Sequence, residues 1–172
     1  MKNTGTLKVA TPTDREIAMT RLFDATRTLV FEALTKPELV KQWLLGPPGW
    51  SMPVCEIDLR VGGAYRHVWR HANGKEMGMG GIYREIVRPE RLVCTELFDQ
   101  AWYPGESLVT TTLAEKGGRT TMTSRMLYVT REARDGVLKS GMERGVAASY
   151  DRLAELMALW GTPGREKGAQ GA

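Results

Sequence analysis

The sequence predicts an α+β protein in which a curved antiparallel sheet of six to seven strands wraps around a long C-terminal helix. Hydrophobic residues recur with a period of two for about 75 residues after Trp50, which is typical of strands. The turns between these segments are short, so neighbouring strands must pair antiparallel. A helical period then begins after Thr130 and continues to Trp160. These three observations together define the fold class.

The N-terminal part predicts one strand followed by two short helices. Residues 16–23 alternate between apolar and polar, which indicates a strand. Asp24 is in position to cap a helix over residues 25–34. A second helix is expected from Pro37, because proline is tolerated at the first helical position. The run Gly46-Pro47-Pro48-Gly49 ends that helix and forces a loop.

Six further strands are expected before the last helix. They are predicted over residues 51–60, 64–71, 75–87, 91–98, 106–115 and 119–129. The Asn73-Gly74 pair is a strong signal for a tight hairpin turn.

The C-terminal segment predicts a long helix with an interruption. Thr130 can cap its start. Gly136 and Gly141 each disfavour a helix interior by about 1 kcal/mol relative to alanine, so a break or kink is expected near residues 136–141. A sheet this wide twists and curls, and only this helix is long enough to cover its concave face. We therefore expect a cavity between the helix and the sheet.

Composition and charge limit the possible functions. Residues 15–160 are expected to form one domain, with loose segments at 1–14 and 161–172. The net charge is only +4 and the basic residues are interleaved with acidic ones, so the sequence does not predict nucleic-acid binding. There is no apolar segment long enough for a signal peptide or a membrane span. With Cys55 and Cys94 interpreted as buried free thiols, a cytoplasmic protein is expected.

The sequence shows no catalytic or metal-binding constellation. His67 and His71 are four residues apart in a strand pattern, which separates them by about 13 Å and prevents them from sharing an ion. There is no other histidine, and the serines and cysteines lack the neighbours that would activate them. No metal and no cofactor are therefore expected.

Aromatic and methionine side chains are the candidates for a ligand-binding site. In a curved sheet whose concave face is covered by a helix, these side chains have few places to lie other than the core and the cavity wall. Glu96 and Arg125 lie in the middle of apolar strands and could both point inward, where they would pair across the cavity. The expected ligand-binding residues are Trp43, Tyr65, His67, Trp69, Met79, Tyr83, Glu96, Trp102, Arg125 and Met142.

Four stretches of the chain resemble a known family. They are RTLVFEALTKPELVKQW at 27–43, DLRVGGAY at 58–65, GGIYREIVRPERLV at 80–93 and EARDGVLKSGMERGVAASYDRLAEL at 132–156. With the order of elements, they resemble the helix-grip fold of the START and birch-pollen-allergen (SRPBCC) superfamily. Within it, the chain is similar to the branch named after the activator of the heat-shock-protein-90 ATPase. The resemblance implies the fold but carries no catalytic residues, because this branch shares no catalytic motif.

Three functions follow as hypotheses. The first is binding of a small, largely apolar molecule, such as a lipid, an aromatic or a polyketide-like compound. The second is an enzyme of the cyclase, aromatase or hydrolase type, which the superfamily also contains. The third is stimulation of the heat-shock-protein-90 ATPase. The co-chaperones of this branch have an additional N-terminal docking domain for which this chain has no room, which counts against the third hypothesis. Homodimerisation through an exposed sheet edge is also open.

Overall fold

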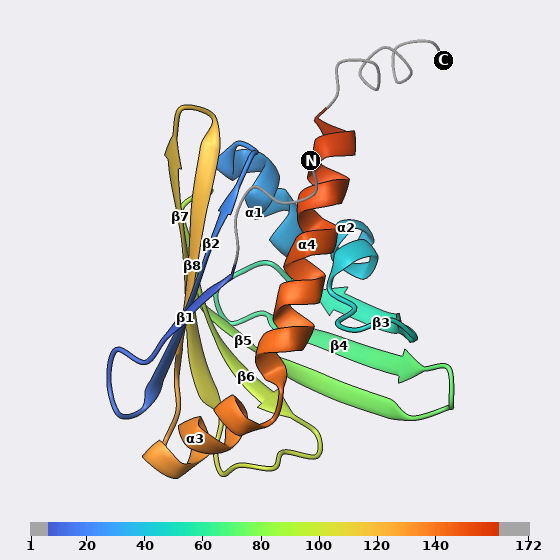
Figure 1. Ribbon diagram of the computed structural model, residues 1–172, viewed down its shortest axis with the longest axis vertical. Coiled ribbons are helices and arrows are strands. Elements are labelled where there is room, and N and C mark those ends of the chain that lie inside the picture. The colour runs from blue at the N-terminus through green and yellow to red at the C-terminus, as the bar shows by residue number, and fades with distance from the viewer. Residues whose placement is uncertain (1–6, 162–172) are drawn as a thin grey trace.

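An antiparallel sheet curls around one side of the long helix α4 (Figure 1). The computed structural model describes residues 7–161. Its strands are β1 (Lys8–Ala10), β2 (Glu16–Phe23), β3 (Trp50–Ile57), β4 (Ala64–His71), β5 (Glu76–Val87), β6 (Arg91–Phe98), β7 (Ser107–Lys116) and β8 (Arg119–Leu127). They are ordered β1-β2-β8-β7-β6-β5-β4-β3 in one eight-stranded sheet, so β1 and β3 form its edges.

Four helices complete this part of the chain. They are α1 (Arg27–Thr35), α2 (Pro37–Trp43), α3 (Arg131–Lys139) and α4 (Met142–Trp160). Helix α1 is capped by Thr26, whose hydroxyl accepts a hydrogen bond of 3.3 Å from the amide of Leu29. The expected cap, Asp24, lies too early, because the chain is still extended at Thr26.

The predicted break in the C-terminal helix separates α3 from α4. Thr130 caps α3 as expected, with its hydroxyl 3.0 Å from the amide of Ala133. Gly141 adopts a φ of 80°, a left-handed conformation that glycine reaches without strain. Helix α3 therefore turns across the end of the sheet, while α4 runs along its concave side (Figure 1).

Strand β1 is an element that the sequence pattern does not predict. It lies within residues 1–14, which were expected to be loose, and pairs with β2 through contacts such as Val9 with Met19. Three residues are too short to produce a periodic signal, so only the pairing with β2 reveals the strand. Residues 1–6 and most of the expected C-terminal tail lie outside the described residues.

The two halves of α4 have different surroundings. In its second half, Leu153 and Met157 are buried in the main hydrophobic core, beside Phe23 and Val40. Burying such a side chain contributes about 1.5–3 kcal/mol, so this half fixes the helix against the sheet. The first half, from Met142 to Tyr150, lies over a pocket instead. Within residues 7–161, none of the helices combines the length and hydropathy needed to cross a bilayer.

Candidate functional site

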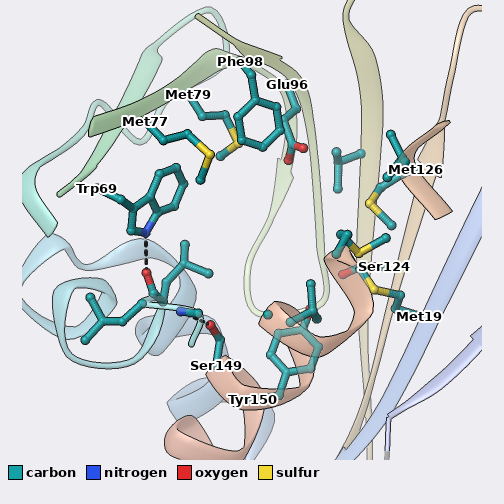
Figure 2. Close-up of a pocket in the computed structure, with 18 of the residues that line it drawn as sticks. Met19, Trp69, Met77, Met79, Glu96, Phe98, Ser124, Met126, Ser149 and Tyr150 are labelled. Carbon is teal, nitrogen blue, oxygen red and sulfur yellow. Dashed lines mark hydrogen bonds between the residues drawn. The ribbon is translucent and has the colours of Figure 1, made fainter. Parts of the chain in front are cut away.

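A pocket of about 460 Å³ lies between the inner face of the sheet and the first half of α4 (Figure 2). Its walls are mainly apolar. The strands contribute Met19, Trp69, Met77, Met79, Phe98, Val109 and Met126, and α3 contributes Val137. Methionine is unbranched and polarizable, so a wall with this many thioethers can adapt to ligands of different shape.

Small residues on α4 leave the pocket open. Gly145 and Ser149 are four residues apart and therefore lie on the same side of the helix, together with Val146. A Cβ atom at Gly145 would lie 3.8 Å from the nearest heavy atom, Cδ of Pro47, which also lines the pocket. Larger side chains at these positions would fill the space that now separates α4 from the sheet.

The loop after α2 forms one wall and is held at both sides. The indole Nε1 of Trp69 donates to the carbonyl of Leu44 at 2.6 Å, and the amide of Gly46 donates to Oγ of Ser149 at 2.8 Å (Figure 2). Arg152 also donates from Nη1 to the carbonyl of Trp43 at 3.2 Å. These contacts satisfy backbone groups that would otherwise be costly to bury, and they fix the loop between β4 and α4.

Glu96 is the acidic residue of the pocket wall. It lies on β6 with Leu92, Cys94 and Phe98, which alternate onto the inner face. Figure 2 shows its carboxylate reaching into the pocket beside the ring of Phe98. Among residues 7–161, no donor or cation pairs with this carboxylate, and burial raises its pKa from 4.5 to about 7. The group is therefore partly protonated near neutral pH.

The charge of Glu96 acts on three tyrosine phenols, those of Tyr103, Tyr128 and Tyr150. Burial, and then the charge of Glu96, raise the pKa of Tyr103 to about 12. Burial also raises the pKa of Tyr150 to about 12, with Ser124 lowering it and Glu96 raising it. The pKa of Tyr128 is raised by burial and by Glu96 in the same direction. These hydroxyls stay protonated at neutral pH, so they can donate hydrogen bonds to a bound molecule but do not act as bases.

Six of the ten residues expected from the sequence line the pocket. They are Trp43, Trp69, Met79, Glu96, Trp102 and Met142.

Tyr65, His67 and Tyr83 belong to the packed core instead of the pocket wall. Tyr65 and His67 do share the inner face of β4 with Trp69. The hydroxyl of Tyr65 donates to the carbonyl of Thr95 at 2.7 Å, and its ring lies 5.5 Å from that of Tyr83. The strand face was therefore predicted correctly, but these three rings lie along a part of the sheet that other side chains cover.

The structure corrects the expected orientation of Arg125. The expectation that it could face inward and pair with Glu96 is wrong, because its side chain lies on the outer face of β8 and pairs with Glu16 at 3.1 Å. Met122, Ser124 and Met126 occupy the inner face, so the residue between Ser124 and Met126 must point outward.

The remaining reactive groups do not form a nucleophilic or metal site. Burial raises the pKa of Cys55 to about 11 and that of Cys94 to about 12, so both are neutral thiols. Burial lowers the pKa of His67 to about 4, which keeps its imidazole neutral. In the described part of the chain, no three His, Cys, Asp or Glu residues gather as metal ligands.

Several lining residues are not among the ten ligand-binding residues expected from the sequence. Met19, Ser124, Met126 and Tyr128 come from the β2–β8 side, and Gly145, Val146, Ser149 and Tyr150 come from α4. Two signals were present: the alternation Met122-Ser124-Met126, and the small residues Gly145 and Ser149 at helical spacing. Neither signal distinguishes a pocket wall from a packed core, because that depends on what lies opposite.

Comparison with known proteins places these features in a family. Residues 24–158 match the family model described as "Activator of Hsp90 ATPase homolog 1-like protein". The chain belongs to this family. The match covers most of the domain, including β6, β8 and nearly all of α4, and therefore every part of the pocket wall except Met19 on β2. No curated protein matches the chain.

Solved structures share the helix-grip fold of this chain. A protein from Rhodobacter sphaeroides is 32% identical over 90% of this chain and 99% of its own, with a TM-score of 0.85. One from Chromobacterium violaceum is 29% identical over 84% of this chain and 98% of its own, with a TM-score of 0.74. The AHSA1 protein from Silicibacter pomeroyi, at 22% identity and a TM-score of 0.67 over 84% of this chain and 99% of its own, shares the fold.

Proposed function

We propose that this family member binds a small, largely apolar molecule in the pocket between the sheet and the first half of α4. The observation that carries the proposal is the pocket itself. Its volume of about 460 Å³ lies within the range of about 300–1,000 Å³ that small-molecule sites occupy. Its wall combines aromatic and methionine side chains with a few polar groups, which is the usual composition of such sites.

The packing of α4 supports the same function. The helix is fixed by Leu153 and Met157, whereas Gly145 and Ser149 keep its other half away from the sheet. Side chains that face an empty apolar space lose the contacts that a packed core would provide. An apolar ligand would restore those contacts and would bury its own surface at about 25 cal/mol per Å².

Filling the pocket from α4 tests the proposal. We expect wild-type protein to enhance the fluorescence of the neutral apolar dye Nile red with one saturable site. Gly145→Leu should abolish this site, because the new side chain starts next to Pro47 and extends along the pocket wall. Leucine also favours a helix interior over glycine by roughly 0.5–1 kcal/mol, so the melting temperature should not fall. Val146→Phe should reduce the affinity in the same way.

The matched control is Gly136→Leu on α3. A Cβ atom at Gly136 would meet nothing within 4 Å, and this residue does not line the pocket. This variant should bind the dye as the wild type does. Unchanged dye binding by folded Gly145→Leu and Val146→Phe would exclude the pocket as the binding site, as would the absence of saturable binding in the wild type.

Glu96 supports a second candidate function, proton transfer to or from a bound substrate. A carboxyl with a pKa of about 7 can act as a general base or acid near neutral pH. In deuterated water, an apolar ketone such as tetralone should then exchange the hydrogens next to its carbonyl faster with wild-type protein than with Glu96→Gln. The carboxylate would take the proton from the carbon next to the carbonyl, and the electron pair of the broken bond would form an enolate. The resulting carboxylic acid would exchange its proton with deuterated water and then return a deuteron to that carbon. Equal exchange rates with both proteins would rule out this function.

A further inference from the structure

The pocket wall carries one sign of charge. Among its described lining residues, Glu96 is the acid, and none is lysine, arginine or histidine. The charge of Glu96 acts on the Tyr103, Tyr128 and Tyr150 phenols and, toward the core, on Tyr65 and Cys94, all of which have raised pKa values. These groups are neutral at physiological pH. The carboxyl of Glu96 is therefore the group that changes charge there.

This distribution of charge disfavours an anionic ligand. A fatty acid or another carboxylate would lose its hydration on entering the pocket and would meet no cation in the wall. It would also be repelled by Glu96 whenever that group is ionised. Neutral and cationic molecules remain as possible ligands. The two classes differ in how strongly they interact with the carboxylate of Glu96.

A bound cation would offset the free-energy cost of an ionised Glu96 carboxylate in an apolar pocket. The carboxylate faces the pocket without a partner in the described chain, and a buried charge is stabilised when an opposite charge comes within a few ångström. A hydrogen bond between two charged groups is also stronger than one between neutral groups. The same contact would neutralise the ligand's charge inside an apolar site.

Aromatic rings in the same pocket wall fit a cation as well. The rings of Phe98 and Trp102 lie 5.1 Å apart, and the rings of Trp102 and Tyr103 lie 5.2 Å apart. All three residues line the pocket, and Phe98 follows Glu96 by two residues on the inner face of β6. The faces of such rings attract ammonium groups.

We infer that the ligand is an apolar amine, whose protonated nitrogen pairs with Glu96 while its hydrocarbon part occupies the methionine-lined remainder of the pocket. The inference rests on the proposed function and narrows it to a ligand class. Arg21 and Arg152 do not line the pocket, so they leave the carboxylate available to the ligand.

Three probes of matched shape test the inference by titration calorimetry: naphthylethylamine, naphthylethanol and naphthylacetate. With wild-type protein at about pH 8, the amine should bind roughly tenfold to a hundredfold more tightly than the alcohol, as expected for a charge-assisted hydrogen bond. The acid should bind most weakly. With Glu96→Gln, the advantage of the amine over the alcohol should disappear, while the alcohol should keep its affinity within about threefold.

The pH dependence adds a second readout. The amine stays protonated between about pH 5 and pH 8, whereas Glu96 becomes ionised over this range. Its affinity for the wild type should therefore rise with pH by about tenfold or more, and its affinity for Glu96→Gln should stay constant. An affinity that falls as pH rises would mean that protonated Glu96 donates to a neutral ligand, and it would overturn the inference.

The outcomes separate this inference from the proposed function. If the alcohol binds the wild type as tightly as the amine and Gly145→Leu abolishes both, the pocket is a site for neutral molecules and the inference is wrong. If the acid binds most tightly, the inference is also wrong. If no probe binds and Nile red binding is also absent, the proposed function itself fails.

Discussion

The guanidinium of Arg21 donates a 2.8 Å hydrogen bond to Asp151 and thereby joins the middle of β2 to α4. The side chain of Arg21 is 1% exposed and that of Asp151 is 44% exposed, so the pair lies at the border between core and solvent. The guanidinium also lies 5.4 Å from the ring centroid of Phe23. Asp151 comes directly after Tyr150, so the contact holds α4 where the pocket ends and the packed core begins.

Asp151→Ala should destabilise the protein by about 1–3 kcal/mol, because it removes the carboxylate from a buried guanidinium. The estimate stays below the cost of breaking a fully buried pair, because Asp151 is partly exposed. Urea unfolding followed by tryptophan fluorescence measures the change. Glu85→Ala is the control, because Glu85 pairs with Arg91 at the surface and should contribute less than about 1 kcal/mol. Equal effects of the two substitutions would contradict this assignment.

Glu96→Gln should stabilise the protein in a pH-dependent way. Burial raises the pKa of Glu96 from 4.5 to about 7, so the folded state binds more protons than the unfolded state within this window. Stability therefore falls as pH rises from about 4.5 to about 7. The variant should match the wild type at about pH 4.5 and exceed it by about 3 kcal/mol at pH 8. Urea unfolding at both pH values gives the difference, and a constant difference would show that Glu96 does not titrate in this range.

His67→Leu should have the opposite pH dependence. Burial lowers the pKa of His67 from 6.5 to about 4, so the unfolded state binds more protons between these values. Above about pH 6.5 the imidazole is neutral in both the folded and the unfolded state, so His67 adds no pH dependence to the stability. Below this pH the unfolded state takes up a proton first, and the stability falls as the pH drops toward 4. The leucine variant should lose less stability than the wild type between pH 6.5 and pH 4.5, by about 2 kcal/mol. Parallel stability curves for the two proteins would mean that His67 is not protected from protons.

Arg125→Gln should leave ligand binding unchanged. Its side chain lies on the outer face of β8, where it pairs with Glu16, and it does not line the pocket. Nile red affinity should stay within about twofold, and stability should change by less than about 1 kcal/mol, as for other exposed ion pairs. Fluorescence titration and urea unfolding measure both quantities. A large loss of affinity would show that Arg125 takes part in ligand binding and would contradict this prediction.

Much of the candidate site follows from alternation along single strands. The apolar neighbours Leu92, Cys94 and Phe98 place Glu96 on the inner face, and Met122 and Met126 place Arg125 on the outer face. The pattern around Glu96 agrees with its expected place in the site. The pattern around Arg125 is equally visible in the sequence, and it indicates an outward side chain when all residues of the strand are considered.

Alternation does not predict which residues on the inner face of a strand reach the pocket and which are covered by other side chains. Tyr65, His67 and Trp69 share one face of β4, but only Trp69 reaches the pocket. The difference depends on the crossing of α4 and on the loop that Ser149 and Trp69 hold in place. Such contacts join residues more than 20 positions apart, which no local pattern encodes.

The order of elements from β2 onward, the antiparallel pairing and the interruption before α4 follow from the sequence, because periodicity, turn residues and glycine conformation act locally. Tertiary packing, by contrast, decided that Leu153 and Met157 pack while Gly145 and Ser149 face an open pocket. It also decided that Glu96 meets this space without a cation, whereas Arg21 meets Asp151. Whether a side chain is buried, paired or open to a ligand depends on the surface opposite, and that surface comes from distant parts of the chain.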